Sequence, residues 1–199
     1  MHSFTYKCVA MSPDFGLIEL IEGCKPLRLI SALEDTITIA QQFNLVASAA
    51  GSYMASYVMG VRDRHFDNVL VRDTDCTLFH IDFGFVLGDT ASVDTSKFAI
   101  TSDLKKLMGV YWDKFIELGV LAFLVLRQQH KFLINYARIA FAYLNKGEMV
   151  EQFIKRQLRI DDMEDDQAAK YIARKLKESP GSKRTKFKNT LHSIATRKK

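Results

Sequence analysis

Two short polar segments in the middle of the chain carry residue types that could perform phosphoryl transfer. The first, "GVRDRHFDN" (60–68), contains Asp63 five residues before Asn68. The second, "FHIDFG" (79–84), contains Asp82 in an Asp-Phe-Gly triplet. Carboxylate and amide oxygens are the ligands that Mg²⁺ prefers, and a metal-bound nucleotide needs little more than such ligands and a group that orients the acceptor hydroxyl.

The residues between these segments predict the element that positions them. "NVLVR" (68–72) and "TLFHID" (77–82) have the composition of short strands, and "DTDC" between them has the composition of a turn. Such a hairpin brings Asn68 and Asp82 to the same end. Either motif alone is a weak signal, since Asp-Phe-Gly occurs in turns and Asp-Arg-His in surface ion pairs. Together, at this spacing, they favour a phosphoryl-transfer site.

The rest of the chain predicts an α+β fold that is mostly helical. Residues 16–23 read as a strand and 36–60 as a helix, whose apolar positions, spaced by four, form a buried face. These positions are Val46, Ala50, Met54 and Val58. Beyond residue 100 the pattern is helical, with Thr101 or Ser102 as an N-cap and two packed helices in the long apolar segment that follows Trp112. Residues 165–178 and 185–195 read as amphipathic helices.

Composition limits the class of protein. The chain has 199 residues, of which 48% are hydrophobic and 26% charged, as expected for one soluble globular domain. No apolar run approaches the ~20 residues of a membrane span. Three isolated cysteines favour a reducing compartment without a structural zinc site. Seven basic residues and no acid follow Ser179. This basic end suits either an anionic membrane surface or a solvated, frayed tail.

"GVRDRHFDN" followed by "FHIDFG" resembles the catalytic and metal loops of the phosphoinositide 3-/4-kinase family, which inverts the His-Arg-Asp order of protein kinases. "YKCVAMSPDFGLIELIEG" is similar to its hinge segment, and "SAAGSYMASYVMG" to the helix that leads into its catalytic loop. The resemblance implies a protein-kinase-like C-terminal lobe, mostly α-helical, in which a short β-hairpin carries the two loops. The N-terminal lobe is expected to be essentially absent.

The resemblance divides the chain, residues 1–199, into five parts. These are a hinge remnant (1–23), a helical segment (24–59), the catalytic and metal loops (60–89), an activation segment (90–103), and a helical block that ends in a basic helix (104–199).

The resemblance also implies a role for individual residues. His65 would be the general base, and Asp63 would position the loop or share the proton. Arg64 would brace the loop by pairing with an acid. Asn68 and Asp82 would bind the metal. The residues that match the ATP-binding positions are Glu19, Leu20, Ile21, Leu70 and Ile81, all of which could equally be ordinary strand residues. His80, inside a strand, is expected to be structural.

The activation segment bears on the substrate. In "FVLGDTASVDTSKFAIT" (85–101), which follows Asp-Phe-Gly, Lys97 is the only base and Asp89 and Asp94 oppose it, so a multiply phosphorylated headgroup would meet little positive charge. Phosphatidylinositol itself is therefore the expected substrate.

The C-terminal end, with Thr185, Lys186 and His192, resembles that of the 3-kinases. Its helix has an apolar stripe (Phe187, Leu191, Ile194) between basic faces, which suits a membrane surface or docking on its own domain. The membrane-facing residues would be Lys183, Arg184, Lys186 and Lys188.

The sequence thus predicts a phosphatidylinositol 3-kinase lobe that uses ATP with Mg²⁺ or Mn²⁺, in the cytoplasm and peripherally bound to membranes. Its partners would be phosphatidylinositol at an anionic membrane and a regulatory subunit, with no nucleic acid. Arg62 and the segment after Asp-Phe-Gly resemble a 4-kinase branch. That alternative, a related serine/threonine protein kinase, and an inactive truncated lobe that acts as a binding module all stay open.

Overall fold

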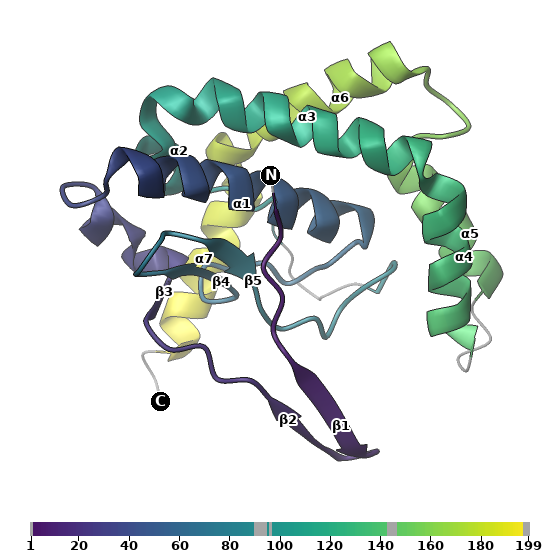
Figure 1. The fold of residues 1–199 in the computed structure, drawn as a ribbon, viewed down its shortest axis with the longest axis horizontal. Helices are drawn as coiled ribbons and strands as arrows, with labels where there is room; N and C mark the ends of the chain where they lie inside the picture. Colours follow the sequence, from purple (N-terminus) through teal and green to yellow (C-terminus); the bar gives the residue numbers. More distant parts are fainter. Residues whose placement is uncertain (1, 90–94, 96, 143–146, 197–199) are drawn as a thin grey trace.

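The structure of the chain, a computed structural model, describes residues 2–89, 95, 97–142 and 147–196 (Figure 1). The described part is mostly helical with two small antiparallel sheets, which agrees with the predicted α+β class. Of the predicted activation segment, residues 90–94 and 96 lie outside the described residues.

Helix α1 (Ile39–Val58) is the central element of the fold. Thr38 begins it with a capping box, since its hydroxyl accepts a hydrogen bond from the Gln41 backbone amide (3.2 Å) and its own amide donates to the Gln41 side chain (3.0 Å). The predicted apolar face of this helix is confirmed as buried: Val46, Ala50, Met54 and Val58.

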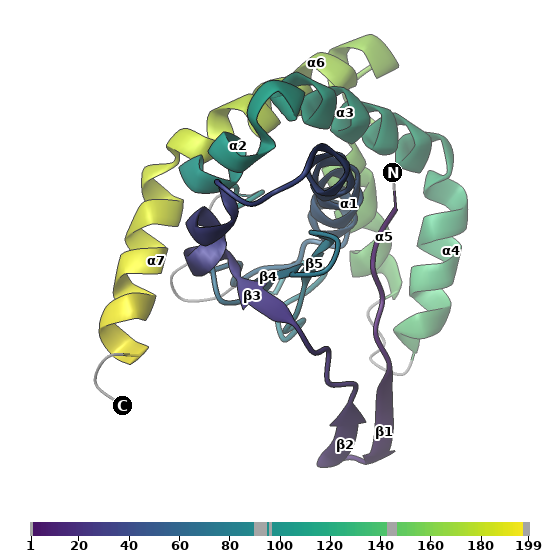
Figure 2. The ribbon, with the colours of Figure 1, turned by 60° about the vertical axis from the view of Figure 1, so that its left-hand side comes forward.

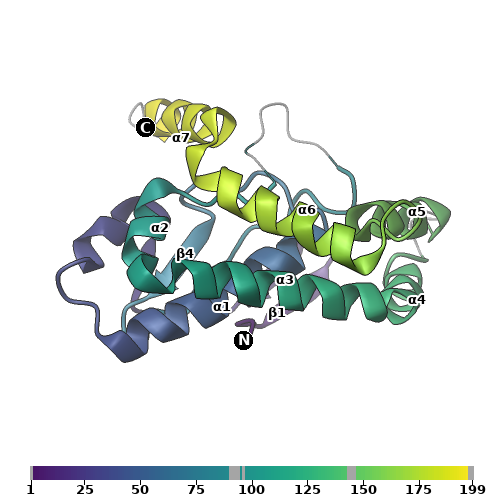
Figure 3. The same ribbon diagram turned by 90° about the horizontal axis from the view of Figure 1, so that it is seen from above.

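The helices around α1 are α2 (Ser102–Met108), α3 (Trp112–Gln128), α4 (His130–Ala140), α5 (Gly147–Leu158) and α6 (Asp165–Glu178). Helix α3 lies against α1, and α6 lies against α3 (Figure 3). A Cβ at Gly119 would come within 2.8 Å of Leu176, so the small residue permits this close α3–α6 contact. The long apolar segment does split into two helices, α3 and α4, as predicted. Thr101 caps α2 by accepting from the Leu104 amide at 3.1 Å.

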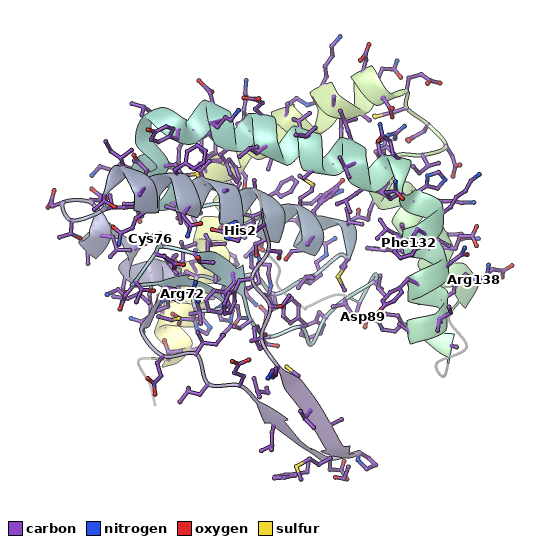
Figure 4. All side chains as sticks on the ribbon, in the orientation of Figure 1. His2, Arg72, Cys76, Asp89, Phe132 and Arg138 are labelled. Carbon is purple, nitrogen blue, oxygen red and sulfur yellow. The ribbon has the colours of Figure 1, made fainter. Side chains whose placement is uncertain are left out.

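A three-stranded sheet, in the order β3-β4-β5, packs against α1. Its strands are β3 (Cys24–Pro26), β4 (Val69–Arg72) and β5 (Leu78–His80). The predicted hairpin is confirmed as β4–β5, and Arg72 and Cys76 lie at its turn (Figure 4). The prediction that 24–59 is helical was wrong at its start. Residues 24–26 pair with β4, and a 3₁₀ helix (Leu27–Leu33) follows before α1 begins.

A second sheet, the hairpin of β1 (Cys8–Ser12) and β2 (Phe15–Ile18), projects from the body of the molecule (Figure 1). The predicted single strand at 16–23 therefore ends early, at Ile18, and gains a partner that the sequence analysis did not predict. Every residue of this hairpin is exposed, including apolar side chains. They are Val9, Met11, Phe15, Leu17 and Ile18.

The chain ends in helix α7 (Lys183–Thr196), which lies beside the sheet on the side opposite α4 and α5 (Figure 2). A short 3₁₀ turn, Ser179–Gly181, joins it to α6. No helix among the described residues combines the length and the hydropathy that crossing a membrane requires.

Candidate active site

The catalytic loop begins where α1 ends, at Gly60. This residue has φ +63°, and a Cβ there would lie 2.2 Å from the ring of Phe153 on α5. Only glycine tolerates both the left-handed backbone and the close aromatic contact. The chain thus turns sharply out of α1 and runs under α5 before it reaches Asp63, which also has a positive φ, +58°.

Arg64 joins the catalytic loop to the metal loop. Its side chain is buried, and its Nε donates to the carbonyl of Arg62 at 2.9 Å. Its Nη1 donates to the carbonyls of Ile81 (2.6 Å) and Asn68 (3.4 Å), and its Nη2 donates to the carbonyl of Asp82. These four described hydrogen bonds of Arg64 go to backbone carbonyls of both loops. That Arg64 braces the catalytic loop by pairing with an acid stays a prediction.

Asn68 and Asp82 lie at the same end of the hairpin, as predicted. The Ile81 amide donates to the Asn68 carbonyl at 3.1 Å, which continues the β4–β5 pairing to the residue before Asp82. The Asn68 side-chain amide donates to the carbonyl of Asp63 at 2.9 Å, which leaves its Oδ1 as the ligand-type atom. The exposed Asp82 carboxylate accepts only from the Gly84 amide, at 3.2 Å, among the described residues.

This donor set fits a hard divalent cation. The Asn68 side chain offers one amide oxygen, oriented by the hydrogen bond of its NH₂ group, and Asp82 offers one exposed carboxylate. Mg²⁺ beside a nucleotide usually has few protein ligands of this kind and completes its coordination with phosphate oxygens and water. That Asn68 and Asp82 bind a metal stays a prediction.

His65 is buried, and its lowered pKa favours the neutral form of the ring at neutral pH. Burial is the main cause that lowers its pKa, and the neighbouring His192 lowers it further, against the opposing effect of Asp63 and Asp67. Its ring stacks on His192, with centroids 3.7 Å apart. Its Nδ1 accepts from the Asp67 amide at 3.3 Å. An imidazole in its neutral form at neutral pH is suited to accept a proton.

Helix α7 packs directly on the catalytic loop. Lys188 Nζ lies 2.7 Å from Asp63 Oδ1, His192 Nε2 lies 2.9 Å from Asp67 Oδ2, and the Phe66 amide donates to the Asn189 side chain at 3.1 Å. The placement of Lys188 on a membrane-facing surface was therefore wrong, because the lysine turns inward to a carboxylate.

The outer face of α7 keeps the other residues of that prediction exposed. Lys183, Arg184 and Lys186 are at the surface, as is the apolar stripe of Phe187, Leu191 and Ile194. The sequence left two alternatives for this helix, contact with a membrane surface and docking on its own domain. The inner face of α7 docks on its own domain. The outer face retains the basic and apolar character that suits an interface with lipid.

The five residues that match the ATP-binding positions lie in two separate segments. Leu70 pairs with Phe79 across the hairpin, so both point to the sheet face opposite α1, and alternation places Ile81 on that face too. Phe4 packs on Phe79 with centroids 4.8 Å apart, a contact that sequence reasoning missed. Glu19, Leu20 and Ile21 follow β2 and lie outside any helix or strand, and Leu20 is 84% exposed.

His80 is a structural residue of the core and not a residue of the candidate site, as predicted. It points to α1, where its Nδ1 lies 2.9 Å from Ser52 Oγ and 3.1 Å from Ser56 Oγ. Complete burial, with a smaller contribution from Arg64, lowers the pKa of His80 to about 3. The ring is thus a neutral part of the core that fixes β5 on α1.

Replacing His80 with glutamine should flatten the dependence of stability on pH. The folded state keeps His80 neutral, whereas the unfolded chain protonates it below its ordinary pKa of 6.5, so its contribution is complete above that pH and is lost as pH falls toward 3. Between pH 6.5 and 5 the loss should be about 2 kcal/mol. Urea unfolding of both proteins at pH 7 and pH 5 measures the difference. Equal losses in the two proteins would contradict a neutral buried His80.

Comparison with known proteins gives the family. Residues 31–143 match the model of the phosphatidylinositol 3- and 4-kinase family, and this match covers more than half of the chain. The chain belongs to that family. The match includes α1, the catalytic loop, the β4–β5 hairpin and the metal loop, and so the elements that position the candidate site.

Curated relatives carry phosphatidylinositol 3-kinase names. The phosphatidylinositol 4-phosphate 3-kinase C2 domain-containing subunit alpha of Pongo abelii is 26% identical over 96% of this chain and 13% of its own length. The phosphatidylinositol 3-kinase catalytic subunit type 3 of Caenorhabditis elegans is 29% identical over 75% of this chain and 17% of its length. The root isoform of phosphatidylinositol 3-kinase from Glycine max is 27% identical over 68% of this chain and 19% of its own length. The chain spans less than a fifth of these relatives.

Proposed function

We propose that this chain is the C-terminal lobe of a phosphatidylinositol 3-kinase, which transfers the γ-phosphate of ATP to a ring hydroxyl of phosphatidylinositol. The observation that carries the proposal is the convergence of Asn68, Asp82 and His65. Two side chains with ligand-type oxygens lie at adjacent strand ends, and Arg64 ties the loop that bears the neutral imidazole to the loop that bears the carboxylate. Family membership and the names of the relatives support it.

Each residue then has a distinct task. His65 accepts the proton of the attacking inositol hydroxyl at Nδ1, the nitrogen that keeps its lone pair in the neutral ring and that releases the long (3.3 Å) hydrogen bond from the Asp67 amide. Asp63 holds the loop by accepting the Asn68 side-chain hydrogen bond at its carbonyl. Asn68 and Asp82 would hold Mg²⁺ or Mn²⁺, which when bound neutralises charge on the transferring phosphoryl group. The face with Leu70 and Ile81 would carry the adenine, beside Glu19, Leu20 and Ile21.

Phosphatidylinositol is the proposed lipid because the described part of the activation segment offers it only one cation. Lys97 is exposed, and its Nζ lies 5.5 Å from the centroid of the Tyr57 ring. The proposed setting is the cytoplasmic surface of an anionic membrane, with Lys183, Arg184 and Lys186 toward the lipid and a regulatory subunit as a further partner. We expect no role in nucleic-acid binding.

The test is product analysis. The chain is incubated with phosphatidylinositol vesicles and Mg·ATP, and the ring position of the new phosphate is determined after deacylation. Phosphate at position 3 is expected, whereas phosphate at position 4 would make the chain a 4-kinase. Transfer to protein serine or threonine instead of lipid would favour the protein-kinase branch.

An inactive binding module is the second candidate, because α7 covers the catalytic loop and stacks His192 on His65. Thermal unfolding separates the two. At about 100 times its dissociation constant, Mg·ATP should stabilise a competent site by ~2.7 kcal/mol, a rise of a few degrees in Tm. No shift at millimolar nucleotide, together with no lipid product, would favour the binding module.

A further inference from the structure

Three segments that are far apart in the sequence enclose a cavity of about 380 Å³ at the corner between α6 and α7. They are the end of the activation segment, the last turn of α6 and the start of α7. Its lining residues are Lys97, Phe98, Lys175, Glu178, Ser179, Ser182 and Arg184. The volume is within the range of pockets that hold small ligands.

The floor of this cavity is fixed by packing and hydrogen bonds. Phe98 is buried and stacks on Tyr57, with centroids 4.9 Å apart. The buried Ser179 hydroxyl accepts from the Ile100 amide at 3.1 Å, and the Ser182 amide donates to the Ser179 carbonyl at 3.0 Å. The activation segment is thereby tied to the corner, so the cavity walls keep their relative positions.

The charge of the cavity is positive. Among the described residues, Lys97, Lys175 and Arg184 line it together with one acid, Glu178. Lys175 Nζ lies 3.3 Å from Glu178 Oε2, in a half-exposed pair of the kind that contributes little and exchanges readily. Within the described ranges, no ion pair joins Lys97 or Arg184 to an acid. Three cations and two serine hydroxyls around one cavity match a phosphate monoester, which carries close to two negative charges and several acceptor oxygens.

We propose that this cavity binds the phosphate monoester of an inositol lipid headgroup, as an anchor separate from the phosphoryl-transfer site. The neighbouring cavity, lined by Ser182 and by Phe66 of the catalytic loop, places the anchor on the same side as the catalytic loop. The proposal rests on the proposed function only for the membrane setting.

Vesicle sedimentation tests the proposal without any turnover. The chain is mixed with phosphatidylcholine vesicles that contain a phosphatidylinositol monophosphate, or phosphatidylserine at equal total charge. We expect preference for the monophosphate, and roughly tenfold weaker binding of the double variant Lys175→Ala/Arg184→Ala, because two charge-assisted contacts are lost. The matched control, Lys170→Ala/Lys177→Ala, removes the same charge from exposed positions of α6 that do not line the cavity. It should change binding less than twofold.

Competition identifies the source of the phosphate. Soluble inositol monophosphate should displace the chain from vesicles at lower concentration than inorganic phosphate does. Equal binding to both vesicle types, or equal losses in the two double variants, would overturn the proposal. So would competition by inorganic phosphate as strong as that by inositol monophosphate. Because binding is read without ATP, its failure beside normal 3-kinase activity would leave the proposed function intact.

Discussion

Replacing Asp82 with alanine is expected to abolish phosphoryl transfer to phosphatidylinositol while the chain stays folded. The carboxylate is exposed and contributes one described hydrogen bond, to the Gly84 amide. The variant should therefore lose about 1 kcal/mol or less of unfolding free energy, part of it from the left-handed backbone at this residue, φ +60°. Activity should fall by a factor of about 1,000 or more, because the proposed ligand of the cation that would neutralise charge on the transferring phosphoryl group is removed.

Initial rates of lipid phosphorylation measure this effect, with vesicle binding and Tm as companion measurements. Asp113→Ala is the matched control, since it removes an exposed carboxylate from the first turn of α3, away from both loops. It should keep full activity. Retention of a tenth of the activity by Asp82→Ala would remove Asp82 from the metal site. Loss of vesicle binding in the same variant would point instead to a role in lipid contact.

The parts of the fold that sequence predicted well depend on local patterns. Helix α1 has a capping residue, Thr38, and an apolar face with helical spacing, so its bounds and its buried side could be read from 20 consecutive residues. The β4–β5 hairpin has two β-rich runs and a turn within 14 residues, Val69 to Asp82. Asn68 and Asp82 could be paired for the same reason, because antiparallel strands joined by a short turn fix the register.

The parts that sequence missed depend on contacts between distant residues. Strand β3 is three residues long and includes Pro26, so it carries no periodic signal, and only pairing with β4 makes it a strand. From the sequence, Lys188 is one of several bases on a basic helix. In the structure it forms an ion pair with Asp63, which lies far from it in the sequence. Asp67, a second acid beside the catalytic motif, indicated that a basic partner could lie nearby. Nothing in the local sequence indicates that this partner is His192.

Arg64 shows how burial supplies a side chain with partners that sequence alone does not indicate. Its place in the motif predicted a brace, and the general preference of guanidinium for carboxylates suggested an acid as its partner. Burial places the guanidinium among loop carbonyls as well. A guanidinium presents five donors in a rigid plane, and four backbone carbonyls from two loops accept them.

Replacing Arg64 with alanine should accordingly damage both stability and activity. Four carbonyls, most of them partly buried, would each lose a charged donor, for a loss of about 2–4 kcal/mol of unfolding free energy. Activity, assayed well below the Tm, should fall by a factor of about 100 or more, because a shift of about 1 Å between the loops would separate His65 from the proposed metal ligands. Urea unfolding and lipid phosphorylation measure the two effects.

The conservative variant distinguishes a positioning role from simple loss of charge. Arg64→Lys keeps the charge but offers three donors on one nitrogen, which cannot reach carbonyls of both loops. It should recover part of the stability and less than a tenth of the activity. Arg174→Ala, at an exposed pair with Glu178 whose atoms are 3.9 Å apart, is the matched control and should change unfolding by about 0.5 kcal/mol or less. Full activity in Arg64→Lys would show that the positive charge, and not the planar set of donors, joins the catalytic loop to the metal loop.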